Sequence, residues 1–123
     1  MSASLRYARI SRTFARMATE QLDDSNFHAR LAEADLAIVD FYAGWCGPCM
    51  LFKPKFARIS ESYPNVAFFI CDGEKAPESR KSIEIPSLPY FGIYRKGAFV
   101  RGFSSTKEEG FREELDAEVA KSS

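Results

Sequence analysis

Two cysteines separated by two residues are the clearest chemical feature of this sequence. Cys46 and Cys49 enclose Gly47-Pro48, directly after an apolar run and at the expected start of a helix. This spacing brings both sulfurs onto one helical turn, close enough to bond, and the N-terminus of a helix favours a thiolate at the first sulfur. We therefore expect thiol–disulfide exchange, with Cys46 as the exposed nucleophile and Cys49 as the buried resolving thiol.

Three other uses of this cysteine pair remain as alternatives that the sequence favours less. A structural zinc site needs four ligands, and beyond the pair the chain offers only Cys71 and His28. An iron–sulfur cluster lacks a fourth thiolate unless two chains share it, and an inert structural disulfide is the third possibility. We expect Cys71 to be a buried strand thiol that behaves as a small hydrophobe, with a regulatory thiol as the alternative. His28 is expected at the surface or half-buried.

Composition limits the class of protein. The chain has 123 residues, 46% of them hydrophobic and 14% aromatic, which predicts one globular domain with its own core. The formal net charge of zero argues against nucleic acid and membrane surfaces as partners, and no apolar run approaches the roughly 20 residues of a membrane helix. Three cysteines do not resemble a secreted disulfide framework, so an intracellular reducing compartment is expected.

The first 18 residues differ from the rest. Four arginines recur there at helical spacing and no acid is present: Arg6, Arg9, Arg12 and Arg16. This pattern describes a mitochondrial transit peptide, with a non-native or vestigial start as the alternative. Either interpretation separates an extension, 1–18, from a catalytic domain, 19–123. The expected location is the cytoplasm, or the mitochondrial matrix if the extension is a native transit peptide.

Strands and helices alternate along the domain, which predicts an α/β fold with helices on both faces of a mixed sheet. Helices are expected over 25–33, capped by Ser25, over 46–63, over 74–82 and from Ser105 onward, where Ser105 and Glu108 form a capping box. Strands are expected over 36–42, 66–71, 90–95 and 98–103. Inward-facing residues are predicted in the second helix (Leu51, Phe52, Phe56 and Ile59) and in the last (Phe111, Leu115 and Val119), whose acidic face should be solvated.

The run 39–49, Val-Asp-Phe-Tyr-Ala-Gly-Trp-Cys-Gly-Pro-Cys, resembles the active-site signature of thioredoxins. The resemblance covers about 19–119 and includes Pro54, the run 63–69, Leu88-Pro89 and the turn at Gly97. It implies the thioredoxin fold, a mixed sheet of about five strands flanked by about four helices. It also implies a protein-disulfide reductase for cell redox homeostasis, monomeric and free of metal or organic cofactor. Protein disulfides would be its substrates, and a reductase or a low-molecular-weight dithiol its electron donor.

The resemblance also assigns roles to single residues. Asp40 would be a buried carboxylate behind Cys49 that accepts its proton, and Gly47-Pro48 is the dipeptide of the more reducing family members. Pro89 would be a cis proline against the disulfide, and the Leu88 backbone would pair with an extended substrate. The apolar rim that receives the partner would consist of Trp45, Pro48, Leu88 and Gly102.

Three positions depart from the family pattern. Ile70 stands where many members carry a charged residue near the buried Asp, so we expect no cation within the motif to compensate Asp40. Glu84 replaces a usual Gly and Tyr90 a usual Thr. The competing function from another class is a docking or chaperone subunit that uses the same apolar rim, with incidental redox activity.

Overall fold

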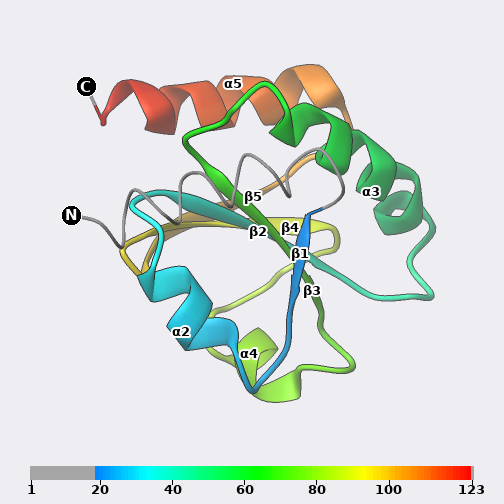
Figure 1. Ribbon diagram of the computed structural model, residues 1–123. Coiled ribbons are helices and arrows are strands. Elements are labelled where there is room, and N and C mark those ends of the chain that lie inside the picture. The colour runs from blue at the N-terminus through cyan, green and yellow to red at the C-terminus, as the bar shows by residue number, and fades with distance from the viewer. Residues whose placement is uncertain (1–18, 123) are drawn as a thin grey trace.

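The computed structural model describes residues 19–122, and within them strands and helices alternate as expected (Figure 1). The predicted extension 1–18 lies outside the described residues. Four helices and five strands occur between 19 and 122: β1 Glu20–Leu22, α2 Phe27–Ala32, β2 Ala37–Tyr42, α3 Gly47–Ser60, β3 Ala67–Asp72, α4 Pro77–Lys81, β4 Tyr90–Arg95, β5 Ala98–Ser104 and α5 Glu108–Ala120.

The strands form one mixed sheet in the order β1-β3-β2-β4-β5. β2 pairs in parallel with β3 and antiparallel with β4, so it is the central strand, and every one of its residues is buried. A strand covered on both faces needs apolar residues at successive positions, which explains the nearly continuous apolar run. The predicted mixed α/β sheet is confirmed. β1 was not located in advance, because three residues are too few for a periodic signal.

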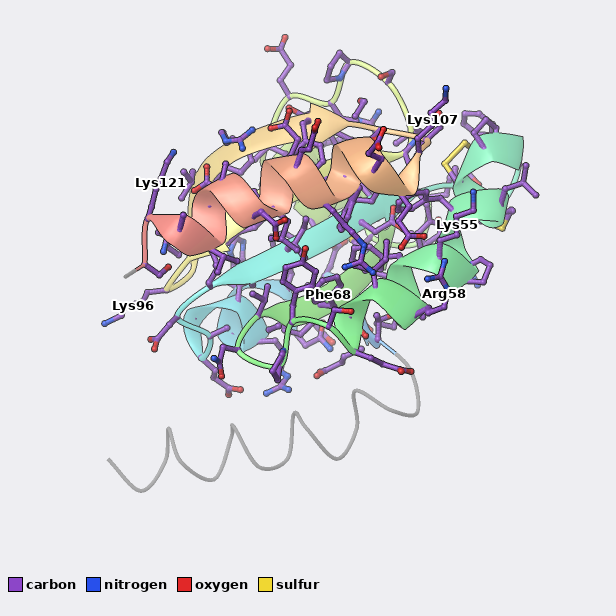
Figure 2. All side chains as sticks on the ribbon, turned by 90° about the horizontal axis from the view of Figure 1, so that it is seen from above. Lys55, Arg58, Phe68, Lys96, Lys107 and Lys121 are labelled. Atoms are coloured by element: carbon purple, nitrogen blue, oxygen red, sulfur yellow. A yellow bond between two sulfur atoms is a disulfide. The ribbon has the colours of Figure 1, made fainter. Side chains whose placement is uncertain are left out.

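Two helical layers enclose the sheet. α3 and α5 lie on one face and α2 and α4 on the other (Figure 1). Aromatic rings fill the space beneath α3 and α5, with centroids 4.9 to 5.8 Å apart in the pairs Phe52–Phe91, Phe56–Phe68, Phe56–Phe91 and Phe91–Phe111. Figure 2 looks down on this layer and shows the Phe68 ring between the two helices. Burying each such ring contributes about 1.5 to 3 kcal/mol, which holds α3 firmly on the sheet.

Both predicted helix caps are wrong. α2 begins after Asn26 without a side-chain cap, and the Ser25 hydroxyl donates to Asp23 Oδ1 at 2.5 Å instead. α5 begins after Lys107, also without a side-chain cap. Its Glu108 accepts hydrogen bonds from Arg58 of α3 and from Arg112, so this carboxylate does not turn back to close a capping box.

The residues predicted to face the core from α3 and α5 are partly confirmed. In α3, Phe52, Phe56 and Ile59 are buried, but Leu51 is 73% exposed. In α5, Phe111 and Leu115 are buried and Val119 is partly buried against the same core.

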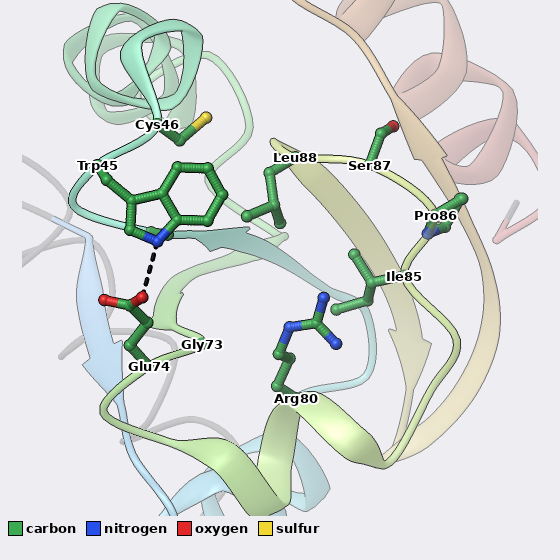
Figure 3. Close-up of a pocket in the computed structure, with 10 residues that line it drawn as sticks. Trp45, Cys46, Gly73, Glu74, Arg80, Ile85, Pro86, Ser87 and Leu88 are labelled. Atoms are coloured by element: carbon green, nitrogen blue, oxygen red, sulfur yellow. Dashed lines mark hydrogen bonds between the residues drawn. The ribbon is translucent and has the colours of Figure 1, made fainter.

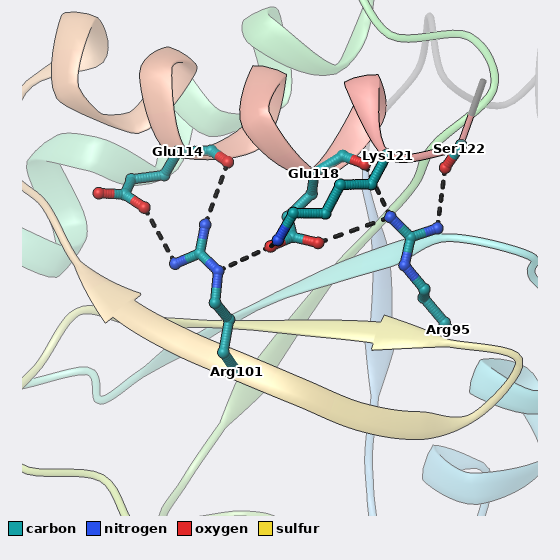
Figure 4. A network of polar contacts seen from close by, with 6 residues as sticks. All are labelled: Arg95, Arg101, Glu114, Glu118, Lys121 and Ser122. Carbon is teal, nitrogen blue, oxygen red and sulfur yellow. Dashed lines mark hydrogen bonds and ion pairs between the residues drawn. The ribbon is translucent and has the colours of Figure 1, made fainter.

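The predicted solvated face of α5 is interrupted by one buried acid. Glu118 is 0% exposed and accepts from Arg101 Nε at 2.7 Å and from Lys121 Nζ at 3.2 Å (Figure 4). Arg95 Nη2 lies 3.5 Å from its other oxygen. Since Arg95 is in β4 and Arg101 in β5, Glu118 ties α5 to the hairpin. We call Glu118 and its cationic partners, Arg95, Arg101 and Lys121, the Glu118 cluster.

Candidate functional site: a disulfide at the start of α3

Cys46 and Cys49 are joined by a disulfide at the N-terminus of α3. Cys46 is the N-cap residue, with extended backbone angles (φ −88°, ψ 107°), and its Sγ accepts the backbone N–H of Cys49 at 3.3 Å. Gly47 and Pro48 occupy the first two helical positions, where the missing N–H of proline leaves no hydrogen bond unmade. A sulfur that caps a helix receives an N–H donor and the positive end of the helix dipole, and both stabilise a thiolate.

The two sulfurs differ in accessibility less than the sequence predicted. Cys46 is 6% exposed and Cys49 is 0% exposed, so the expectation of an openly exposed Cys46 is wrong for the disulfide form. The Trp45 indole and Leu88 line the same pocket as Cys46 (Figure 3). Cys46 nevertheless lines a surface pocket and Cys49 does not, so an approaching disulfide reaches Cys46 first.

This pocket, of about 450 Å³, is defined by the loops around the disulfide (Figure 3). Trp45 is 70% exposed, and its Nε1 donates to Glu74 Oε2 at 2.7 Å. Sequence reasoning missed Glu74, whose position on the loop after β3 gives no local signal. The pocket is lined by Ala43, Trp45, Cys46, Gly73, Glu74, Arg80, Ile85, Pro86, Ser87 and Leu88.

Of the predicted rim, Trp45 and Leu88 line the pocket, whereas Pro48 and Gly102 do not. Gly102 lies in β5 opposite Gly92, and a Cβ on it would come 2.4 Å from the side chain of Tyr90. Gly102 therefore makes room for the tyrosine that follows the proline loop. The Leu88–Pro89 peptide bond is cis, as predicted, and Pro89 is buried beside the pocket-lining Leu88.

Asp40 is fully buried in the central strand, as predicted, and neither of its carboxylate oxygens has a hydrogen-bond partner among the described residues. It alternates with Ile38 and Tyr42, which belong to the same core cluster as Cys49, so it faces the α3 layer. Burial raises the pKa of Asp40 from 3.8 to about 7, and the positive charge of Lys53 offsets part of this rise.

The cation that lowers the pKa of Asp40 lies outside the signature run 39–49, within which none was expected. Lys53 follows Cys49 by one helical turn in α3, and its Nζ lies 4.3 Å from the centroid of the Tyr42 ring. The i, i+4 spacing from Cys49 was the signal that could have found it. Cys49, Lys53 and Asp40 thus belong to one face of the contact between α3 and β2.

The remaining candidates lie elsewhere. Cys71 is 0% exposed on the opposite face of the sheet, and burial raises the pKa of its thiol to about 12. His28 is exposed on α2. Between residues 19 and 122, no group of three or more His, Cys, Asp or Glu side chains could hold a metal ion. Within the same residues, none of the helices has the length and apolar character needed to cross a bilayer.

Comparison with known proteins agrees with this geometry. The family model described as Thioredoxin matches residues 18–120. Thioredoxin of Ophiophagus hannah is 35% identical over 95 residues, covering 76% of this chain and 90% of the relative. Thioredoxin-3 of Saccharomyces cerevisiae, a mitochondrial protein, is 32% identical over 76 residues, covering 62% of this chain and 60% of that protein's length.

Solved structures give the same result. Mitochondrial thioredoxin 3 from Saccharomyces cerevisiae in its oxidised form superposes with a TM-score of 0.74 at 25% identity, covering 87% of this chain and 98% of that one. A chain in the crystal structure of ferredoxin:thioredoxin reductase in complex with thioredoxin f2 superposes with a TM-score of 0.75 at 25% identity, covering 81% and 94%. The chain belongs to the thioredoxin family and is a protein-disulfide oxidoreductase whose Cys46–Cys49 pair occupies the active-site position.

Proposed function

We propose that this chain reduces disulfides in other proteins through Cys46 and is then oxidised at Cys46–Cys49. The Cys46 thiolate attacks one sulfur of a target disulfide, the target S–S bond breaks, and one target thiolate leaves. Cys49 then attacks Cys46 Sγ, the mixed disulfide breaks, and the second target thiolate leaves. Two electrons pass to the target, and the Cys46–Cys49 disulfide remains.

The observation that carries this proposal is the position of Cys46 Sγ as the N-cap of α3. The sulfur accepts the Cys49 N–H and opens onto the pocket, so its thiolate would be both stabilised and reachable. The docking or chaperone alternative would use the apolar pocket without needing a sulfur at this position.

In this proposal Asp40 accepts the proton of Cys49 when Cys49 attacks the mixed disulfide. A carboxyl group with a pKa of about 7 is poised to exchange a proton near neutral pH. Its burial on the α3 side of β2, where Cys49 is also buried, supports the assignment. The backbone of Leu88 would pair with an extended substrate, with Trp45 and Leu88, which line the pocket, as apolar walls. We propose that Pro89, Pro48 and Gly102 complete the substrate-binding surface outside this lining.

For the electron donor we propose a protein reductase, with a low-molecular-weight dithiol as the alternative. The similar thioredoxin f2 was solved in complex with ferredoxin:thioredoxin reductase, which supports a reductase in general. We further propose that a monomer of residues 19–123 is the working unit.

We propose a reducing compartment inside the cell: the cytoplasm, or the mitochondrial matrix if 1–18 act as a transit peptide. One relative is mitochondrial by name, which supports the second location. Localisation of fluorescent fusions of the full chain and of 19–123 tests this, because only the full chain should then enter mitochondria.

Insulin reduction with dithiothreitol tests the main proposal. Cys46→Ser should abolish the activity, and Cys49→Ser should accumulate mixed disulfides through Cys46. Full activity of Cys46→Ser, or complexes trapped through Cys49, would contradict the assigned roles. The potential of the pair should lie near the roughly −270 mV typical of thioredoxin, and a value near −180 mV would favour an oxidising role.

A further inference from the structure

Arg80 differs from the other arginines of residues 19–122 because its guanidinium forms no ion pair there. Every other arginine there forms an ion pair with a glutamate: Arg30, Arg58, Arg95, Arg101 and Arg112. The guanidinium of Arg80 has neither an ion pair nor a side-chain hydrogen bond within these residues. It lines the same pocket as Cys46 (Figure 3).

The structure holds Arg80 in place although its head group is unpaired. α4, which carries it, is anchored by Asp24, whose Oδ1 accepts from Ser79 N at 2.8 Å and from Ser79 Oγ at 2.7 Å. The stem of Arg80 lies over Gly73, where a Cβ would come 3.0 Å from Arg80 Cδ. A half-buried guanidinium on an anchored stem loses less conformational entropy when it binds a ligand than a free surface arginine does.

The charges around the pocket are separated. Glu74, the acid that lines it, lies on the Trp45 side and accepts the indole N–H, whereas the Arg80 guanidinium lies beside Ile85 (Figure 3). On α4 itself, Glu78 and Lys81 pair with each other at 3.8 Å. The side of the pocket formed by Arg80, Ile85 and Leu88 therefore presents an unneutralised positive charge within an apolar wall.

We propose that Arg80 is a specificity-determining residue that binds a carboxylate of the target protein, so that this chain prefers disulfides whose cysteine is flanked by Asp or Glu. The inference rests on the proposed reductase function and deepens it. A guanidinium matches a carboxylate in bidentate geometry, and an extended substrate held at Leu88 would carry its flanking side chains past this wall.

Single-turnover reduction of peptide disulfides tests the proposal. Peptides with one cysteine, joined as disulfide dimers, would carry Glu, Gln or Lys at each flanking position in turn. The second-order rate constant with pre-reduced protein is followed by Trp45 fluorescence. At one position, Glu should react roughly two- to fivefold faster than Gln, and Lys slower, with the difference shrinking at high salt.

Charge substitutions then assign the preference. Arg80→Gln should remove it and Arg80→Glu should invert it in favour of Lys, an inversion that misfolding cannot produce. Lys81→Gln, the same charge change at the next residue, should leave the preference intact.

Three outcomes would overturn the inference. Equal rates for all peptides with active protein would do so while leaving the reductase function standing, whereas no reduction of any peptide would refute that function as well. An effect of Arg80 seen only with oxidised glutathione would assign the subsite to a small thiol instead of a protein.

Discussion

Asp40 and Glu118 are both 0% exposed, yet their surroundings drive the two carboxylates in opposite directions. Asp40 has no hydrogen-bond partner among the described residues, and burial raises its pKa to about 7. Burial alone would also raise the pKa of Glu118, but hydrogen bonds from Arg101 and Lys121 outweigh it and the pKa falls below its ordinary value. Burial therefore does not by itself determine the charge of an acid, because the hydrogen bonds and ion pairs of the carboxylate also determine it.

The difference separates a chemical site from a structural one. A carboxyl group that can change its charge near neutral pH is useful beside a thiol that must lose a proton. A carboxylate locked in its charged form is useful where a helix must stay docked on a hairpin. Each prediction below tests one side of this contrast.

The largest expected effect is on stability at Asp40. A raised pKa means that the folded state binds the proton more tightly than the unfolded state. The contribution of Asp40 to stability is therefore fully present below about pH 4 and is lost as the pH rises through about 7, a loss of roughly 4 kcal/mol. Asp40→Asn should remove this loss and be more stable than the wild type at pH 8 by a similar amount. Urea unfolding of the disulfide form between pH 4 and pH 8 measures it, and equal pH slopes in the two proteins would contradict it.

Removal of the Glu118 charge should destabilise the protein, whereas removal of the Asp40 charge should stabilise it. Glu118→Gln leaves Arg95 and Arg101 without their buried partner and should cost about 2 to 3 kcal/mol, below the usual range for a buried pair because both arginines are partly exposed. Reductase activity should persist in the folded fraction. Glu114→Gln is the matched control, since Glu114 pairs with Arg101 from an exposed position and should cost less than about 1 kcal/mol.

The Glu118 cluster also has its own pH signature. Because its folded pKa is lowered, its contribution is present above the ordinary pKa of about 4.5 and is lost as the pH falls. The acid limb of the wild-type unfolding profile should therefore flatten in Glu118→Gln. An unchanged acid limb would contradict the lowered pKa.

The third effect is kinetic. Asp40→Asn should slow resolution of the mixed disulfide near pH 7 by about tenfold, less than a typical general base because water can also take the proton. The deficit should vanish at high pH, where Cys49 ionises unaided. Single-turnover quench measurements separate this step from the first attack by Cys46. A wild-type rate across the neutral range would exclude Asp40 as the proton acceptor.

The smallest effect concerns Lys53. Its charge lowers the pKa of Asp40, so Lys53→Met should move that pKa above about 7 and shift the pH–rate profile to the alkaline side. NMR titration of the Asp40 side-chain carboxyl reports it directly. Lys55→Met, on the exposed side of the same helix, is the control and should leave the titration unchanged.

Elements with a strong local pattern could be predicted from sequence. The strand 90–95 has the expected bounds, and the predicted 36–42 differs from β2 by one residue, because apolar runs between turn residues mark buried strands. Leu51 was misassigned because the buried face of α3 follows Cys49, Phe52 and Phe56 at helical spacing, and Leu51 lies about 100° from Phe52 on that helix.

Features that depend on distant partners could not be predicted. Ser105 and Glu108 have the spacing of a capping box, but Arg58, fifty positions away in the chain, binds the glutamate. From the sequence alone, Glu118 resembles the other surface acids of the last helix. Only the folded chain places Arg95 of β4 and Arg101 of β5 beside it. At the site, the two cysteines and Asp40 could be predicted from the local sequence of their own helix and strand. Lys53 could have been found from its i, i+4 spacing to Cys49, whereas Glu74 and Arg80 needed the assembled fold.

The central place of β2 has a consequence for synthesis on the ribosome. β2 and the two cysteines are translated early, but the partners that complete their surroundings, β4 and α5, come last. Until Leu88 and the strand that follows it have left the exit tunnel, Cys46 of a nascent chain lacks one wall of its pocket and Cys49 lacks part of the core that buries it. The emerging polypeptide therefore carries its two reactive sulfurs uncovered through much of translation, and only a nearly finished chain can close the site around them.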